Sequence, residues 1–269
     1  MANLCGHAGS PAGTFATLAE VTVMAGGASP LNYGYGHLAE AAKSASLPPM
    51  NISSDSFQTQ RTNMVEGQLR PNKVNQRPVL ARFAAVPRES YVSNSASAYL
   101  DQPATIAAGR ESYSPLVAAR LVQELNVQPS DKVLVVACGT GYTTSIIAPL
   151  CASVVAVEDD ATLAKQAEAN FALEGHTNIK LEIDNPTHGF QSGAPYDIIL
   201  IDAPFAELHG SLVSQLAEGG RLGGVRIGTD GLPEATIFTK HGNSLVAEVL
   251  FETKGTVHPA FTVSDKFVF

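Results

Sequence analysis

The sequence of 269 residues predicts a doubly wound α/β fold, in which a mostly parallel sheet carries helices on both faces. Residues 133–136 form a continuous apolar run, Val-Leu-Val-Val, which is typical of a central parallel strand buried on both faces. A glycine-containing loop follows this run, and strand-like and helix-like segments alternate after it. We therefore expect a Rossmann-like order of elements from residue 131 onward.

The expected elements follow the chain in order. Before the sheet we expect helices over 57–69 and 78–83, irregular chain over 90–111, and a helix that begins at Ser114-Pro115. In the sheet region we expect strands at 133–136, 153–157, 178–183 and 197–202, and helices at 142–150, 160–173 and 206–217. A strand after Gly219-Gly220 and an antiparallel hairpin of 235–240 with 245–252 complete the predicted sheet.

The N-terminal segment differs from the rest of the chain in composition. Residues 1–49 are rich in Ala, Gly and Ser, and their only charged side chains are Glu20, Glu40 and Lys43. They show no sustained apolar period. We expect a poorly ordered extension over 1–56 and one domain over 57–269, with a helical layer at 57–130 and the sheet at 131–269.

Charge and hydropathy set aside two classes of partner. The chain has 25 acidic and 17 basic residues, a net charge of -8, and no cluster of Lys and Arg, so we expect no nucleic acid partner. Its most apolar region, 133–157, is interrupted by glycines and hydroxyl residues, which is wrong for a membrane span. We expect no membrane association.

The cysteines and histidines give no metal signature. Cys5, Cys138 and Cys151 are odd in number and form no C-x-x-C pair, which argues against a disulfide framework or a thiolate site. The seven histidines contain no helical pair four residues apart. We therefore expect no metal site and a cytoplasmic location. Cys138 is expected to be a packing residue. No pattern in the sequence indicates an oligomeric state.

The loop after the first strand, CGTGYTTS (138–145), predicts a cofactor site. Gly139 and Gly141 lie at the carboxyl end of that strand, where backbone can approach a ligand closely. A dinucleotide fingerprint needs a third glycine at 144, where Thr144 stands, and this weighs against NAD.

The second predicted strand ends at Glu158, where a carboxylate can accept hydrogen bonds from both ribose hydroxyls of an adenosine. The loop and this acid together fit NAD or S-adenosylmethionine. The alternative interpretation is that Asp159 or Asp160 caps the next helix while Glu158 is solvated.

Several blocks from Asn63 onward resemble the protein-L-isoaspartate O-methyltransferase family, in its order and at compatible spacing. They are NMVEGQLRPNKV (63–74), VPRESYV (86–92), AYLD (98–101), VLVVACGTGY (133–142), VVAVE (154–158), APYDIILIDA (194–203) and QLAEGGRL (215–222). Many methyltransferases share the glycine loop, whereas the N-terminal blocks with APYD and QLxxGGRL are specific to this family. The chain resembles a divergent member over about three-quarters of its length.

The resemblance implies a Rossmann-like methyltransferase fold with an added N-terminal layer. It also implies that S-adenosyl-L-methionine is the cofactor and that isoaspartyl carboxylates of damaged proteins or peptides are methylated, a repair reaction. A carboxylate with a pKa of about 4 is already ionised at neutral pH and needs no general base, so alignment and water exclusion carry the catalysis. Two alternatives stay open: a methyltransferase with another acceptor, and a non-catalytic binding module.

Carried over residue by residue, the resemblance places the methionine end of the cofactor against Ala137, Gly139, Thr140 and Gly141 and its ribose against Glu158. Two loop positions differ, because the family has a glycine where Ala137 stands and an acid where Val135 stands.

Three further polar residues are cofactor candidates. The family's acid for the adenine amino group falls on Asp184 or Asn185, and a simple Asx turn is the alternative interpretation of these residues. Asp202, at the end of the fourth predicted strand, is either a ligand of the cofactor's amino group or a strand-end carboxylate.

The segment 109–115 aligns with the family's G-Q-T-I-S-Q-P, whose serine orients the acceptor carboxylate. Aligned without gaps on Gly109 and Pro115, that serine falls on Tyr113, between Ser112 and Ser114, and these three hydroxyl residues are the candidate catalytic residues. Ser114 is also expected to be the N-cap of the following helix. We predict that Tyr113→Phe sharply reduces methyl transfer and spares cofactor binding.

Overall fold

A computed structural model describes residues 54–228 and 230–263 of the chain. The predicted poorly ordered segment 1–49 lies outside these residues. Of the predicted extension over 1–56, only residues 54–56 are described, and they belong to helix α1. This helix begins at Ser54 rather than at Phe57, where the apolar pattern placed its start.

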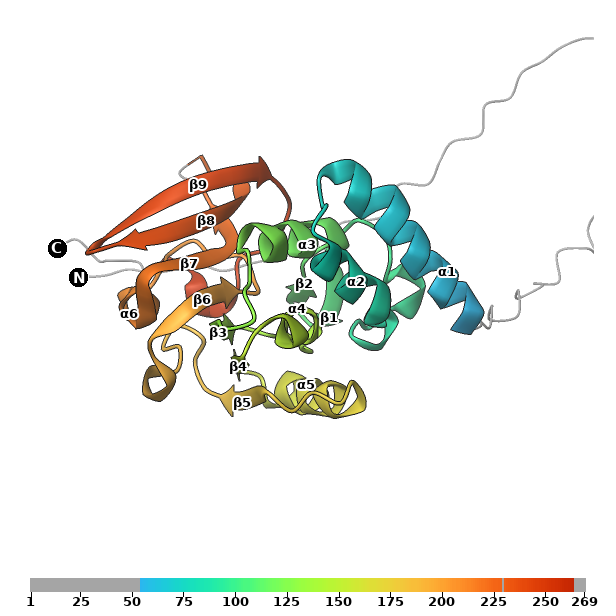
Figure 1. Cartoon of the computed structure of the whole chain (residues 1–269), viewed down its shortest axis with the longest axis horizontal. Coiled ribbons are helices and arrows are strands. Elements are labelled where there is room, and N and C mark those ends of the chain that lie inside the picture. The colour runs from blue at the N-terminus through green and yellow to red at the C-terminus, as the bar shows by residue number, and fades with distance from the viewer. Residues whose placement is uncertain (1–53, 229, 264–269) are drawn as a thin grey trace, which may run out of the picture. The chain divides into compact units, whose positions relative to one another are not determined.

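Within the described residues, seven strands form one sheet in the order β5-β4-β3-β6-β7-β8-β9 (Figure 1). Strands β5, β4, β3, β6 and β7 pair in parallel, and β7-β8-β9 pair antiparallel. The doubly wound sheet and its C-terminal hairpin are thereby confirmed. The strands are β3 (Lys132–Val136), β4 (Ser153–Glu158), β5 (Ile179–Ile183), β6 (Tyr196–Ile201), β7 (Leu216–Ile227), β8 (Pro233–His241) and β9 (Ser244–Glu252).

The helices are those that the apolar patterns predict, with shifted ends. α3 contacts both α2 and strand β8, and Figure 1 shows α1 and α2 outside it, which is the added N-terminal layer. The α-helices are α1 (Ser54–Met64), α2 (Arg77–Ala85), α3 (Pro115–Glu124), α4 (Tyr142–Ile147), α5 (Ala161–Leu173) and α6 (Gly210–Gln215), with a π-helical turn at Val65–Leu69. Short 3-10 turns cover Arg70–Asn72, Arg88–Ser90, Ser95–Ser97, Ala148–Leu150, Gln191–Gly193 and Pro259–Phe261.

The core lies on both faces of the sheet because alternate side chains of a strand point to opposite faces. In β3, Val133 and Val135 belong to a cluster shared with the N-terminal helices, α4 and α5. Leu134 and Val136 belong to a second cluster, shared with α6 and Phe261. All four side chains are fully buried, so the continuous apolar run in the sequence reflects a strand covered on both sides.

Two of the segments predicted from the sequence, 90–111 and 206–217, differ from the structure. Residues 90–111 were expected to be irregular, yet they include a hairpin of β1 (Ala104–Ala107) with β2 (Arg110–Ser112). These strands are too short to show a period of two in the sequence. The helix expected over 206–217 begins only at Gly210, because the amides of Ala206 and Glu207 donate to the Phe261 carbonyl, at 3.0 and 3.2 Å.

Candidate active site

The polar residues predicted for the cofactor follow neighbouring strands at one edge of the sheet. Backbone hydrogen bonds continue the pairing just beyond the strands: Cys138 N donates to Val157 O at 3.2 Å, and Asp202 N donates to Val136 O at 2.9 Å. Asp184 N likewise donates to Glu158 O at 3.2 Å. The loop after β3, Glu158, Asp184 and Asp202 therefore share the carboxyl edge, where open α/β sheets bind ligands.

The loop between β3 and α4 turns through left-handed backbone conformations. Gly139 and Gly141 have φ of 57° and 87°, and a Cβ at Gly141 would lie 2.4 Å from the Phe171 ring. Ala137 also has a positive φ, of 54°, which costs an L-residue roughly 1–2 kcal/mol. The glycine that the family has at this position would avoid this strain, and Ala137 tolerates it.

Glu158 ends β4 as a fully buried carboxylate. Its Oε2 accepts from Gly139 N at 2.6 Å, and its Oε1 accepts from Asp160 N at 3.1 Å. The interpretation of Glu158 as a solvated side chain was therefore wrong. Asp160 does cap α5, since its carboxylate accepts from Thr162 N and Leu163 N.

The Arg110 guanidinium binds both oxygens of Glu158. Nη1 lies 2.9 Å from Oε1 and Nη2 lies 3.1 Å from Oε2, the bidentate arrangement that arginine favours with carboxylates. Arg110 Nη1 also lies 3.2 Å from Asp159 Oδ1. Burial raises the pKa of Glu158, while the hydrogen bonds and the charge of Arg110 oppose that shift.

His258 approaches the same carboxylates from the C-terminal segment. Its Nδ1 accepts from Ala260 N at 3.1 Å, and its Nε2 lies 3.6 Å from Asp159 Oδ1. Burial and the nearby Arg110 lower the pKa of His258 to about 4, so its ring is neutral at neutral pH. Glu158, Asp159 and His258 could offer a metal three ligand atoms, but the Arg110 guanidinium already pairs with both carboxylates, and we assign no metal here.

Asp202 is a buried carboxylic acid at the end of β6. Burial raises its pKa to about 8, although the Thr143 hydrogen bond and the Arg88 charge oppose the shift. Thr143 Oγ1 lies 3.0 Å from its Oδ1 and donates to it. At neutral pH Asp202 is therefore mostly protonated, which suits a hydrogen-bonding role better than that of a counter-ion.

The sequence model described as Protein-L-isoaspartate(D-aspartate) O-methyltransferase (PCMT) matches residues 59–254, the span that contains the loop, Glu158 and Asp202. The chain belongs to the protein-L-isoaspartate O-methyltransferase family. The resemblance carried by the sequence blocks is confirmed.

Curated relatives agree with this family. A protein-L-isoaspartate O-methyltransferase of Herpetosiphon aurantiacus is 36% identical over 171 residues, which cover 63% of this chain and 76% of that protein. One of Picosynechococcus sp. is 36% identical over 179 residues, 65% of this chain and 81% of that protein. A Plasmodium falciparum beta-aspartate methyltransferase structure in complex with S-adenosyl-L-homocysteine has a TM-score of 0.62 and 20% identity, and covers 75% of this chain and 97% of that one. That likeness shows a shared fold.

The three hydroxyl residues that the family suggests for catalysis are all engaged within the protein. Ser114 accepts from Val117 N as the N-cap of α3, as predicted. Ser112 Oγ accepts from Arg88 Nη2 at 3.0 Å. Tyr113 is 4% exposed, and its hydroxyl donates to a backbone carbonyl on β6 and accepts from a backbone amide on β7.

Asp184 and Asn185 form the turn that the sequence left as one of two interpretations. Asp184 Oδ1 accepts from Asn185 N at 2.6 Å, and Asn185 Oδ1 accepts from Thr187 N at 2.9 Å. Asp184 is also next to His188, whose Nδ1 lies 3.3 Å from its carboxylate. The turn follows β5 directly, so either side chain stays a candidate for the adenine contact.

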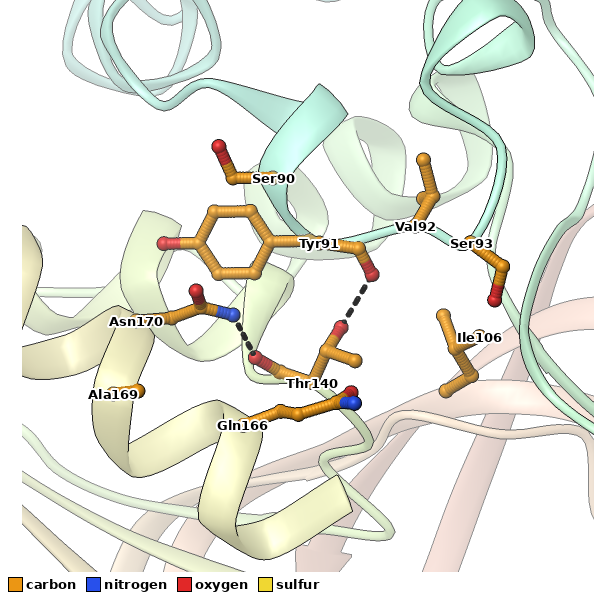
Figure 2. A pocket seen from close by; sticks show the side chains of 9 residues that line it. All are labelled: Ser90, Tyr91, Val92, Ser93, Ile106, Thr140, Gln166, Ala169 and Asn170. Atoms are coloured by element: carbon orange, nitrogen blue, oxygen red, sulfur yellow. Dashed lines mark hydrogen bonds between the residues drawn. The ribbon is translucent and has the colours of Figure 1, made fainter. Parts of the chain in front are cut away.

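A cavity of about 340 Å³ adjoins the loop after β3 (Figure 2). Thr140 lines this cavity and is held by two hydrogen bonds. Its Oγ1 donates to Tyr91 O at 2.7 Å, and its carbonyl accepts from Asn170 Nδ2 at 3.0 Å. Ile106 lines the same cavity from β1. The loop is thus joined to the N-terminal layer through Tyr91 and to α5 through Asn170.

The residue types fit an adenosine cofactor. The loop of small residues and the buried Glu158 carboxylate lie together, because Gly139 N donates a hydrogen bond to Glu158 Oε2. Within the same chain, Arg110 competes for that carboxylate, and Ile106 Cδ1 would lie 2.6 Å from a Cβ at Gly139. The hairpin β1-β2 therefore covers both parts of the expected site.

Sequence reasoning missed Arg88, Arg110 and His258. Arg88 is fully buried, donates from Nε to Ala98 O at 2.9 Å, and lies over the Tyr142 ring at 4.6 Å. In the sequence, Arg88 appeared only as one residue of the block VPRESYV (86–92), with no role assigned to it. Arg110 faces two acids that are 48 and 49 residues away, a separation at which pairing has no local signal.

Proposed function

We propose that this protein is an S-adenosyl-L-methionine-dependent O-methyltransferase that methylates the isoaspartyl carboxylate of damaged proteins, as a step in their repair. The observation that carries the proposal is the buried Glu158 beside the glycine loop, in a chain that belongs to the protein-L-isoaspartate O-methyltransferase family. The relatives named for this activity support the same acceptor.

Each part of the cofactor has a candidate partner. The loop 137–141 would contact the methionine end, Glu158 the ribose, and Asp184 or Asn185 the adenine amino group. S-adenosylmethionine supplies an electrophilic methyl group when it is bound. The protein's part is to align the acceptor carboxylate and to exclude water, and the burial of Glu158 and Asp202 favours that task.

The acceptor side of the proposed site is formed by hydroxyl residues before helix α3. Ser112, Tyr113 and Ser114 stay candidates by their alignment with the family's motif. Tyr113 is held by two backbone hydrogen bonds and Ser112 by Arg88, so both hydroxyls have fixed positions. Ser112 is the last residue of β2, so the β1-β2 hairpin sets the position of this hydroxyl.

The partners and location follow from the proposed activity. Isoaspartyl-containing proteins or peptides are the proposed substrates. We propose a cytoplasmic location, which the free thiols of Cys138 and Cys151 fit. Cys138 is a buried core residue, as predicted. Among the described residues, no helix is both long and apolar enough to cross a membrane.

The experiment that tests the proposal is transfer of a labelled methyl group to an isoaspartyl peptide and to its aspartyl twin. We expect label on the isoaspartyl peptide alone. Equal labelling of the two peptides would favour the alternative acceptor, and no labelling of either would count against methyl transfer to this class.

A second candidate, a methyltransferase-fold module without turnover, is favoured by one observation: Arg110 and two backbone amides occupy the oxygens of Glu158. Calorimetric titration with S-adenosylhomocysteine separates the two candidates. Micromolar binding supports the enzyme, whereas no binding by the wild-type protein or by variants of Arg110 supports the module.

A further inference from the structure

The hairpin β1-β2 lies across the cofactor loop, and side chains from both of its strands reach the expected site. From β1, Ile106 contacts the loop at Gly139, and a methyl group at that glycine would collide with it. From β2, Arg110 reaches Glu158 and Asp159. Both contacts involve residues that the cofactor is expected to use.

The contacts of Glu158 leave no oxygen lone pair free for a ribose. A carboxylate offers about four acceptor positions. Here Oε1 accepts from Arg110 and Asp160 N, and Oε2 accepts from Arg110 and Gly139 N. A ribose diol would need at least one of the positions that Arg110 holds, because the two amides are fixed by the backbone.

The two faces of β1 line two separate cavities. Ile106 lines the cavity of about 340 Å³ beside Thr140. Thr105 and Ala107, which point the other way, line a cavity of about 170 Å³ together with Arg110 and Thr256. Residues of the hairpin therefore line both cavities.

We propose that Arg110 is an affinity-setting residue: it holds the hairpin 104–112 over the site, and the cofactor binds only when Arg110 releases Glu158. This inference rests on the proposed function. A ligand that needs a minor open state binds with an apparent affinity reduced by the fraction of molecules that are open. The wild-type protein therefore binds the cofactor more weakly than a protein that lacks the Arg110 side chain.

The local charges explain why the closed state is favoured. The Arg110 side chain is 12% exposed and that of Glu158 is fully buried, so the pair is shielded from water and only weakly screened by salt. Asp159 adds a second negative charge, and the neutral His258 adds no competing cation. On release, Arg110 would move toward solvent beside the exposed Glu111.

The test compares S-adenosylhomocysteine affinity, by calorimetry, in the wild type, Arg110→Gln and Arg110→Ala. Glutamine is the residue that the family motif has at this position, and it carries no charge. We expect both variants to bind at least about tenfold more tightly than the wild type, which corresponds to a closed state of at least about 90%.

Arg61→Gln is the matched control. Arg61 and Glu89 form a similarly shielded ion pair in the N-terminal layer, with side chains 10% and 16% exposed. We expect its affinity to stay within about twofold of the wild type, because the expected loss of stability is similar while the site is untouched. A gain equal to that of Arg110→Gln would overturn the proposal.

A measurement on the wild type keeps the inference testable if the variants unfold. Hydrogen exchange of amides in 104–112 should increase when S-adenosylhomocysteine is added at saturation, because the hairpin opens. Unchanged or slower exchange there would overturn the proposal. Equal micromolar affinity of wild type and Arg110 variants would also overturn it and leave the proposed function intact, whereas binding by none of them would defeat both.

Discussion

The hydroxyl of Tyr113 donates a hydrogen bond to the backbone carbonyl of Ile201 at 2.9 Å. It also accepts one from Val225 N at 3.1 Å, so a single side chain joins the ends of β6 and β7. This position is the one at which the family's motif has the acceptor-orienting serine. The residue thus combines a predicted catalytic role with an observed structural one.

Tyr113→Phe tests both roles of this hydroxyl. Removal of the hydroxyl leaves a buried amide and a buried carbonyl without their partner, and we expect a loss of about 1–3 kcal/mol in the free energy of unfolding. The catalytic prediction adds a sharp fall in methyl transfer with cofactor binding retained. Urea unfolding and single-turnover labelling, at a temperature where both proteins are folded, measure the two effects. An unchanged rate would remove Tyr113 from the mechanism.

Glu158→Gln tests the assignment of the ribose contact. The amide nitrogen of glutamine donates and cannot accept, so the side chain can no longer bind both ribose hydroxyls. We expect this loss to outweigh the release of Arg110, and S-adenosylhomocysteine to bind at least about tenfold more weakly. Calorimetry measures the affinity. Glu182→Gln is a suitable control, because Glu182 lies on the neighbouring strand and pairs with Lys180 near the surface. If both substitutions changed the affinity equally, Glu158 would lose its assigned role.

Asp202→Asn tests the buried acid through the pH dependence of stability. The folded protein keeps the Asp202 proton up to about pH 8, whereas the unfolded chain releases it near the ordinary pKa of 3.8. Asp202 therefore lowers stability progressively as the pH rises between these two values, and no further above them. We expect the melting temperature of the variant, relative to the wild type, to increase from about pH 5 to about pH 8 and then level off. A constant difference across this range would contradict the account.

Gly141→Ala tests the packing of the loop after β3 against α5. The new methyl group would meet the Phe171 ring in addition to the cost of a left-handed alanine, and we expect a loss of about 2–4 kcal/mol. Gly109→Ala is the matched control, since Gly109 has a φ of 71° and open space around it. Its loss should be about 1–2 kcal/mol, from the backbone alone. Similar losses in chemical unfolding would show that the contact with Phe171 yields without cost.

Local signals predicted the scaffold of the site. The apolar run of β3 and the strand that ends at Glu158 follow from burial on both faces, which composition records directly. The Ser114 cap follows from a hydroxyl residue before a proline, a signal confined to neighbouring residues. The signals for these features lie in consecutive residues, so they can be recognised in the sequence without knowledge of the tertiary contacts.

The contacts within the site could not be predicted in the same way. The pairing of Arg110 with Glu158 depends on the placement of a short hairpin that shows no strand period. The burial of Asp202, and with it the protonated carboxyl group, depends on how α4 and β6 pack. Such contacts join distant segments, and they determine the properties of a site whose location the sequence predicts well.

The measurement that tests the central claim most directly is the rate of methyl transfer from labelled S-adenosylmethionine to a peptide pair that differs only in one isoaspartyl linkage. We predict labelling of the isoaspartyl peptide, with the label released as methanol on mild alkaline treatment, because a carboxyl methyl ester hydrolyses under those conditions. Equal labelling of both peptides, label that resists alkali, or no labelling of either peptide would contradict the claim that this protein is an isoaspartyl carboxyl methyltransferase.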